Sequence, residues 1–265
     1  MALTVVLLSA VGASAVGVLA AGCAQVRANS QTNPASGGAL SGELHVLVAA
    51  SLLPVAEVLA DGFETAHPGL KVQVVAAGSA ALREHVLAGA PADVFIPADP
   101  MHLETVQDHV GLAHGPVIVA RNSLVLAVPA RNDAGVAALA DLARRELLIG
   151  LCAAEVPCGA LARRGLTQAG IQPAPDTEEP NVRALVTKLA AGELDAAVVY
   201  ASDARPADNR AIVSLGWTAG TAPEATYAAG VPSDAPHLAG AEAFVAYLQS
   251  EAAHRAFADF GFAAP

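Results

Sequence analysis

Residues 44–96 read LHVLVAASLLPVAEVLADGFETAHPGLKVQVVAAGSAALREHVLAGAPADVFI, and the order of apolar runs in this stretch decides the fold. Three runs have the length and Val-rich composition of buried strands, and two segments with helical periodicity separate them. This β-α-β-α-β order predicts a parallel sheet with right-handed crossovers. The strands are expected at 44–50, 71–75 and 93–96, and the helices at 52–67 and 79–87.

The same alternation resumes after a segment that crosses between two parts of the chain. We therefore expect an α/β protein of two lobes, each a mostly parallel sheet flanked by helices. Lobe I is assigned residues 43–123 plus 229–265, and lobe II residues 124–228. A single large doubly wound domain is the alternative. The further elements expected are strands at 123–128, 147–151 and 196–200, helices at 159–168 and 181–191, and one long amphipathic helix at 239–257.

The composition excludes one class of partner and leaves another open. The 265-residue chain is 54% hydrophobic and has a formal net charge of -11 at pH 7. No Lys- or Arg-rich patch occurs in it, which argues against binding to nucleic acid. An acidic protein can still bind a small anion, because a local site made from helix N-termini can oppose the global charge.

The N-terminal segment predicts export. Residues 2–22 contain no charged side chain and end at Cys23. The small residues before this cysteine are similar to a lipobox, which predicts a signal peptide at 1–22, a lipid on Cys23 and a flexible tether over 23–42. Two features depart from that pattern: Ala20 replaces the usual Leu, and no basic residue precedes the apolar run. An uncleaved transmembrane anchor is the alternative; in both cases the chain is anchored on the extracytoplasmic face of the cell membrane.

Two further cysteines, Cys152 and Cys158, are close enough in sequence to form a disulfide in an oxidising compartment. Two free thiols packed as small apolar groups are the alternative. Neither a C-x-x-C pair nor a His cluster accompanies them, so no site for a bare metal cation is predicted. His102, His109 and His114 are expected on solvated faces and loops.

Two strand-to-helix junctions share one design that suits an anion. Ser51 and Ser79 each stand where a strand of the predicted parallel sheet meets the next helix, among Ala and Gly neighbours. Ligands of α/β sheets bind at this edge. Each Ser offers a hydroxyl beside the unpaired N–H groups of a first helical turn, so a dianion can be held there without a buried Lys or Arg. The alternative is that each Ser is an ordinary N-cap.

Six segments spread along the chain match a known family: VAASLLPV (48–55), GSAALREHVLAGAPADVFIPAD (78–99), RNSLVLAVP (121–129), VPCGALARRGL (156–166), NVRALVTKLAAGELDAAVVYASDA (181–204) and FGF (260–262). With them the chain resembles the periplasmic molybdate-binding proteins of ABC transporters, which are type II periplasmic binding proteins. The order and spacing of the segments are more specific than any one of them. The resemblance implies a ligand cleft between the lobes, capture of molybdate or tungstate without enzymatic activity or cofactor, and delivery to an ABC permease. We expect a monomer.

The resemblance also implies a set of ligand-binding residues. In that family two Ser residues of the first lobe, backbone N–H groups at two helix starts of the second lobe, and a Tyr hydroxyl hold the oxyanion. The matching positions are Ser51, Ser79, Cys158, Val182 and Tyr200.

Three positions near these residues depart from the family pattern. Ala80 removes a hydroxyl that many relatives have, Cys158 replaces a more usual Ala, and Asn181 replaces a frequent Asp. These changes leave oxyanion binding intact but bear on selectivity.

Alternative functions make different demands on the sequence. Sulfate, phosphate and small organic anions are the alternative ligands; sulfate shares the charge and shape of molybdate and differs chiefly in size. A serine hydrolase would use Ser51 or Ser79 as nucleophile, yet no G-x-S-x-G motif surrounds either residue. For a binding protein we expect lobe closure on the ligand, with hinges near 122–125 and 227–231.

Overall fold

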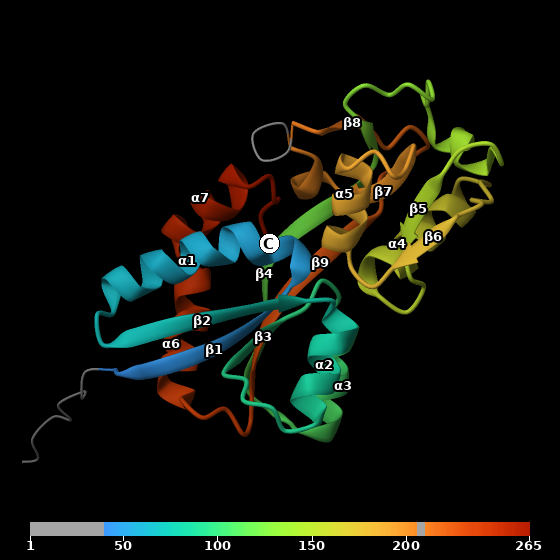
Figure 1. Cartoon of the computed structure of the whole chain (residues 1–265). Coiled ribbons are helices and arrows are strands. Elements are labelled where there is room, and N and C mark those ends of the chain that lie inside the picture. The colour runs from blue at the N-terminus through green and yellow to red at the C-terminus, as the bar shows by residue number, and fades with distance from the viewer. Residues whose placement is uncertain (1–39, 206–209) are drawn as a thin grey trace, which may run out of the picture. The chain divides into compact units, whose positions relative to one another are not determined.

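A computed structural model describes residues 40–205 and 210–265, and these residues form one compact unit (Figure 1). The predicted signal peptide, Cys23 and nearly all of the predicted tether lie outside the described residues. Among the residues that are described, no helix combines the length and the apolar composition that crossing a membrane requires.

The stretch 44–96 folds into the predicted β-α-β-α-β unit. Its three strands are parallel and lie in the order β2-β1-β3. The chain moves outward from β1 to β2 and back to β3, so right-handed crossovers place α1 and α2 on opposite faces of this sheet. The elements of lobe I that precede the crossing strands are β1 (Gly42–Ala49), a 3-10 turn η1 (Ala50–Leu52), α1 (Leu53–Ala66), β2 (Leu70–Ala77), α2 (Ser79–Leu87), β3 (Val94–Ile96) and α3 (Pro100–His109).

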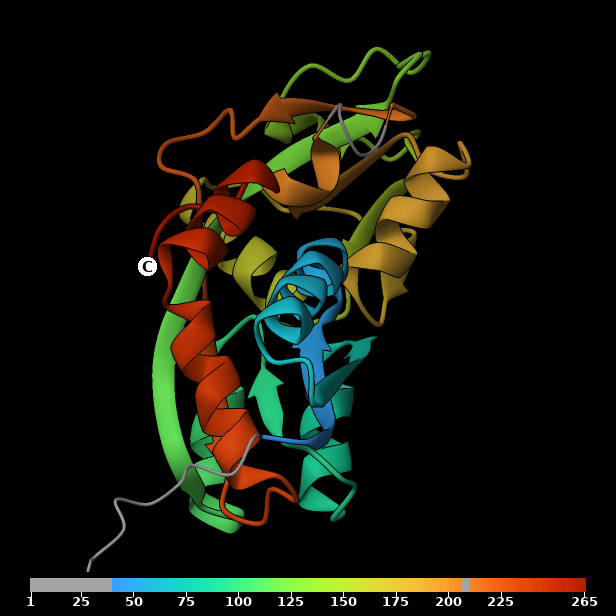
Figure 2. The same ribbon diagram turned by 90° about the vertical axis from the view of Figure 1, so that its left-hand side faces the viewer.

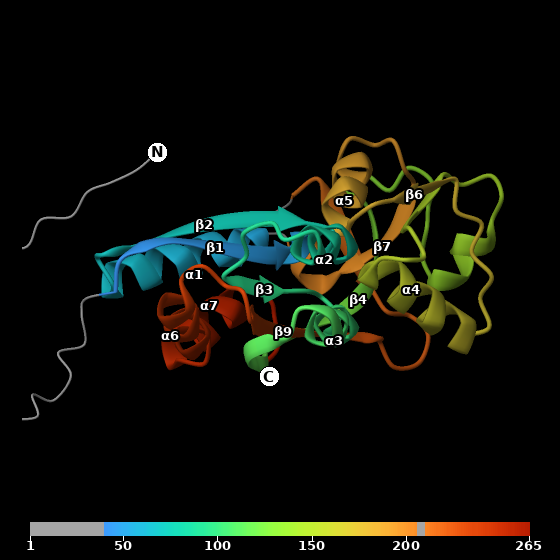
Figure 3. The same ribbon diagram turned by 90° about the horizontal axis from the view of Figure 1, so that it is seen from below.

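Lobe II contains a second parallel set in the order β7-β5-β6, with α4 and α5 on either side of it (Figure 3). Strand β6 was not predicted, because its three residues Thr-Glu-Glu show no apolar run. The elements of lobe II are η2 (Leu139–Ala143), β5 (Ile149–Cys152), α4 (Pro157–Gln168), β6 (Thr177–Glu179), α5 (Val182–Ala190), β7 (Ala196–Tyr200), η3 (Ala201–Ala204) and β8 (Ile212–Gly216).

Two antiparallel strands, β4 (Leu112–Pro129) and β9 (Glu224–Pro232), join the lobes. β4 is much longer than the strand predicted at 123–128 and runs along one side of the molecule (Figure 2). Its residues up to Ser123 pair with β9, and its residues from Leu124 pair with β7 and β8. All nine described strands thereby belong to one sheet. The exact lobe boundaries stay a prediction, since the described residues form a single unit.

The prediction of one long C-terminal helix at 239–257 is wrong. The chain forms two helices, α6 (Leu238–Leu248) and α7 (Glu251–Asp259), with a break between them. Ser250 stands in the break with extended backbone angles, and its hydroxyl accepts a hydrogen bond from the N–H of Ala253 at 3.2 Å. A Ser in this position starts a new helix by satisfying one of its free N–H groups.

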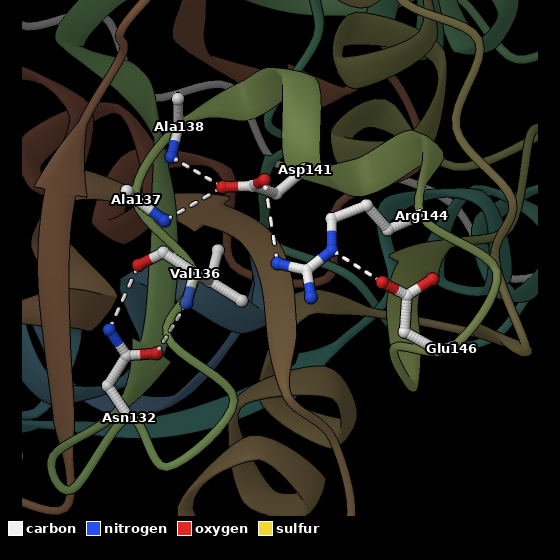
Figure 4. A network of polar contacts seen from close by, with 7 residues as sticks. All are labelled: Asn132, Val136, Ala137, Ala138, Asp141, Arg144 and Glu146. Carbon is white, nitrogen blue, oxygen red and sulfur yellow. Dashed lines mark hydrogen bonds and ion pairs between the residues drawn. The ribbon is translucent and has the colours of Figure 1, made fainter.

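Polar side chains order the long connection from β4 to β5 (Figure 4). Asn132, with a left-handed φ of 45°, exchanges two hydrogen bonds with the backbone of Val136 at 2.9 and 3.0 Å. Asp141 accepts from the two backbone N–H groups of residues 137–138, at 2.8 and 3.0 Å. These contacts satisfy backbone groups that no strand or helix pairs, so the connection has a defined path although η2 is its only regular element among the described residues.

One buried carboxylate fastens distant segments of lobe I together. Asp93, fully buried just before β3, accepts hydrogen bonds from the backbone N–H of His45 at 2.8 Å and of His237 at 2.7 Å. His45 lies in β1, whereas His237 is the residue before α6. The first strand and the C-terminal helices therefore depend on the same side chain.

We predict that Asp93→Ala lowers the free energy of unfolding by about 2–4 kcal/mol, because two backbone donors lose their acceptor. Urea denaturation followed by circular dichroism measures this. Asp99→Ala is the matched control: it removes only the N-cap of α3, worth about 1 kcal/mol. Equal losses in the two variants would contradict the role given to Asp93.

Candidate functional site

The structure brings all five residues of the predicted site to one small cavity of about 20 Å³. The cavity lies where the lobe I turns after β1 and β2 meet the starts of α4 and α5 and the end of β7 in lobe II. A Cβ on Gly78 would lie 2.6 Å from the carbonyl oxygen of Pro180, so only glycine permits this approach of the two lobes. The residues that line this cavity include Ser51, Ser79, Cys158, Val182 and Tyr200.

Ser79 is held as a hydroxyl donor by its surroundings. It is the first residue of α2 and is buried. Its oxygen accepts a hydrogen bond from the backbone N–H of Ala98 at 3.1 Å, and Ala98 also lines the cavity. The hydroxyl hydrogen of Ser79 is thus left for an acceptor in the cavity.

Ser51 has a partner that the sequence did not reveal. It is buried in η1, and its Oγ lies 2.8 Å from the hydroxyl oxygen of Tyr227 in β9. Tyr227 is fully buried and 176 residues away in the chain. No motif marked Tyr227, because it stands in an Ala-rich strand without a polar neighbour pattern.

Backbone donors reach the cavity from lobe II. Cys158 follows Pro157 in the first turn of α4, where the N-cap residue Val156 provides no side-chain acceptor. Val182 opens α5, and its N-cap Asn181 accepts from the N–H of Ala184 at 3.0 Å rather than from Val182. First-turn N–H groups have no partner within their own helix, so both are available to a ligand.

A disulfide joins Cys158 to Cys152. It ties the end of β5 to the start of α4, so the helix turn that carries the Cys158 N–H is fixed to the sheet. Gly159 next to it allows close packing, because a Cβ there would lie 1.9 Å from the carbonyl oxygen of Ala153.

Tyr200 is the last residue of β7 and lines the cavity. The side chain is 1% exposed, and among the described residues its hydroxyl oxygen meets no partner at hydrogen-bonding geometry. Burial raises the pKa of this hydroxyl well above its usual range, and the nearby Tyr227 adds to the effect. Tyr200 therefore stays protonated at neutral pH and can donate.

The cavity contains neutral donors and no counter-charge. Among the described residues, no Lys, Arg, Asp or Glu lines it. The described residues also contain no group of three His, Cys, Asp or Glu side chains placed to hold a metal ion. The expectation that His102 is solvated was wrong: it is buried beside Arg83, and burial lowers its pKa.

A second, larger cavity of about 210 Å³ adjoins Ser51 and contains charged groups. Asp203 and Arg183 line it. Asp203 is half-buried as a residue, but its Oδ2 is buried and unpaired among the described residues. This burial raises the pKa of Asp203 to about 7, although Arg183 acts in the opposite direction.

This raised pKa predicts a stability that depends on pH. The pKa of Asp in an unfolded chain is about 3.9, so the folded state binds the Asp203 proton more tightly than the unfolded state. The free energy of unfolding therefore falls as the pH rises from about 4 towards about 7. In Asp203→Asn the melting temperature should change less with pH between about pH 4 and 7 than in the wild type. Above that range the melting temperature of the variant should be higher than that of the wild type. Differential scanning calorimetry tests this. Asp133→Asn, at an exposed side chain, should leave the pH profile unchanged; a wild-type profile in Asp203→Asn would contradict the assignment.

Comparison with known proteins identifies the family. The family model of bacterial extracellular solute-binding proteins matches residues 44–263. The molybdate-binding protein ModA of Mycobacterium tuberculosis is 33% identical over 256 residues, covering 94% of this chain and 95% of that protein. These findings confirm the resemblance seen in the motifs and favour a solute-binding protein over a serine hydrolase.

Solved structures share the fold. The periplasmic molybdate-binding protein of Azotobacter vinelandii superposes with a TM-score of 0.70 at 21% identity, covering 84% of this chain and 99% of that one. The sulfate-binding protein SubI of Mycobacterium tuberculosis gives 0.71 at 16% identity, covering 83% and 86%. With its two lobes and its cavity at the strand ends, the chain belongs to the family of bacterial extracellular solute-binding proteins.

Proposed function

We propose that this protein captures molybdate, or the closely similar tungstate, outside the cytoplasmic membrane and delivers it to an ABC importer. The observation that carries the proposal is the convergence of Ser51, Ser79, Cys158, Val182 and Tyr200 on one small cavity without a counter-charge. The relative named ModA supports the choice of ligand.

The donors suit a small, fully ionised oxyanion. The residues that supply three hydroxyls and two backbone N–H groups come from both lobes and line the same cavity, which suits an anion with four oxygens. A hydrogen bond to a charged group contributes about 1.5–3 kcal/mol, and the positive ends of α4 and α5 add to this. A dianion is thereby bound by neutral groups in an acidic protein.

Binding and release follow from the two lobes. We propose that 43–123 plus 229–265 and 124–228 move as units, with hinges near 122–125 and 227–231. The change of β4 partners between Ser123 and Leu124 supports the first hinge. Closure brings the Cys158, Val182 and Tyr200 donors to an anion already held by the two Ser hydroxyls, and opening at the permease releases it.

We propose that the protein is a monomer with a lipid anchor. A signal peptide over 1–22 and a lipid on Cys23 would hold the binding unit near its permease. The Bacillus subtilis relative named a putative ABC transporter substrate-binding lipoprotein, 28% identical over 225 residues, supports this anchor.

Sulfate is the second candidate ligand. It carries the same charge and shape as molybdate, and the sulfate-binding protein SubI has the same fold. Phosphate fits less well, because hydrogenphosphate carries a proton that needs an acceptor, whereas the groups around the cavity are placed as donors.

Isothermal titration calorimetry with molybdate, tungstate, sulfate and phosphate in turn tests the proposal. We expect strong heats and micromolar or tighter binding for molybdate and tungstate. Binding of sulfate alone would replace the ligand and retain the fold and site; binding of none of the four would refute the proposed function.

Ser51→Ala should weaken molybdate binding by about 1.5–3 kcal/mol, since one hydrogen bond to the charged ligand is lost. The exposed Ser214, whose Oγ accepts from the N–H of Gly216 in β8, provides the matched control as Ser214→Ala. Calorimetry on both variants checks the difference. Equal affinity in Ser51→Ala and wild type would remove Ser51 from the site.

A further inference from the structure

Tyr227 is a buried hydroxyl that the proposed ligand set does not include. Its ring is fixed by edge-to-face packing against Tyr200 and Phe262, with ring centres 6.2 and 5.5 Å apart. Its hydroxyl is directed at Ser51, with 2.8 Å between the oxygens. The side chain is fully buried, so its hydroxyl meets Ser51 inside the protein and not at the surface.

The direction of this hydrogen bond matters for the ligand. A Ser hydroxyl has one hydrogen to donate and lone pairs to accept with. A phenol is the more acidic of the two groups and hence the better donor. A fully ionised oxyanion can only accept, so Ser51 must donate to it, and the Ser51 oxygen must then accept from Tyr227. Donation from Tyr227 to Ser51 and from Ser51 to the anion polarises each hydrogen bond in turn and strengthens the contact to the anion.

Ser79 has the same arrangement with a backbone donor. The N–H of Ala98 donates to its oxygen, so its hydrogen is also left for the cavity. Each of the two Ser oxygens of lobe I therefore accepts a hydrogen bond from another group of the protein. One of these donors is a backbone N–H, which ordinary side-chain substitutions leave in place, whereas the other is a single side-chain hydroxyl.

We propose that Tyr227 is a specificity-determining positioning residue, which donates to Ser51 and so keeps the Ser51 hydroxyl as a donor toward oxyanions that carry no proton. This inference rests on the proposed function. Without the Tyr227 hydroxyl, the Ser51 hydrogen is free to rotate away and its oxygen can face the ligand. The cavity then gains an acceptor that a protonated oxyanion such as hydrogenphosphate requires.

Tyr227→Phe removes the hydroxyl alone, and Tyr247→Phe in α6 removes a hydroxyl that does not line the cavity. We measure dissociation constants for molybdate, sulfate and phosphate by calorimetry at about pH 8, where inorganic phosphate is a dianion that carries one proton. The ligands are then matched in charge and differ in the proton.

Tyr227→Phe should weaken the binding of the tightest proton-free anion about threefold to tenfold, as expected for one hydrogen bond, and narrow its preference over phosphate. Tyr247→Phe should change neither value. An unchanged preference in Tyr227→Phe, whether affinity is retained or is lost equally for every anion, would overturn the inference. Absence of binding in the wild type would instead refute the proposed function.

A double-mutant comparison separates an effect of Tyr227 through Ser51 from an effect on binding by another route. If Tyr227 acts through Ser51, then Ser51→Ala and Ser51→Ala/Tyr227→Phe bind molybdate with equal affinity, because the hydroxyl has no partner left to orient. A further loss in the double variant would show that Tyr227 acts by another route and would overturn the inference.

Discussion

The antiparallel pairing of β4 with β9 is the interaction on which the rest of the structure depends. It brings Asn122, just before lobe II in the chain, close to Tyr227, near the end of lobe II, and it carries β4 onward to pair with β7. Because parallel strands end at one edge of a sheet, the ends of β1 and β2 in one lobe then face the end of β7 in the other. Helix starts from both lobes meet there without a long loop.

The polar groups around this meeting point follow one rule. Buried hydroxyls and N–H groups need partners, and the protein satisfies one side of each Ser from its own structure: Ala98 for Ser79 and Tyr227 for Ser51. Asn122 donates to Ser202 at 2.8 Å in the same region. The donors that remain unpaired, Tyr200 above all, are those the proposed ligand would use.

Prediction from the sequence succeeded where local signals are strong. The β-α-β-α-β unit was predicted because fully buried parallel strands produce continuous apolar runs. β6 was missed because three polar residues lack such a run, and the break at Ser250 was missed because the apolar pattern continues across it. Periodicity reports which side is buried, whereas the break is decided by one side chain capping α7.

The sequence by itself determined the α/β class, the Ser-bearing helix starts and, through the resemblance of its motifs, the family; it also predicted the five site positions. Only the tertiary structure decided that these positions share one cavity, that Gly78 must be glycine against Pro180, and that Tyr227 meets Ser51. The physical reason is separation along the chain. A cap or a strand is encoded within a few residues, but a hydrogen bond across 176 residues exists only once the sheet has set both ends in place.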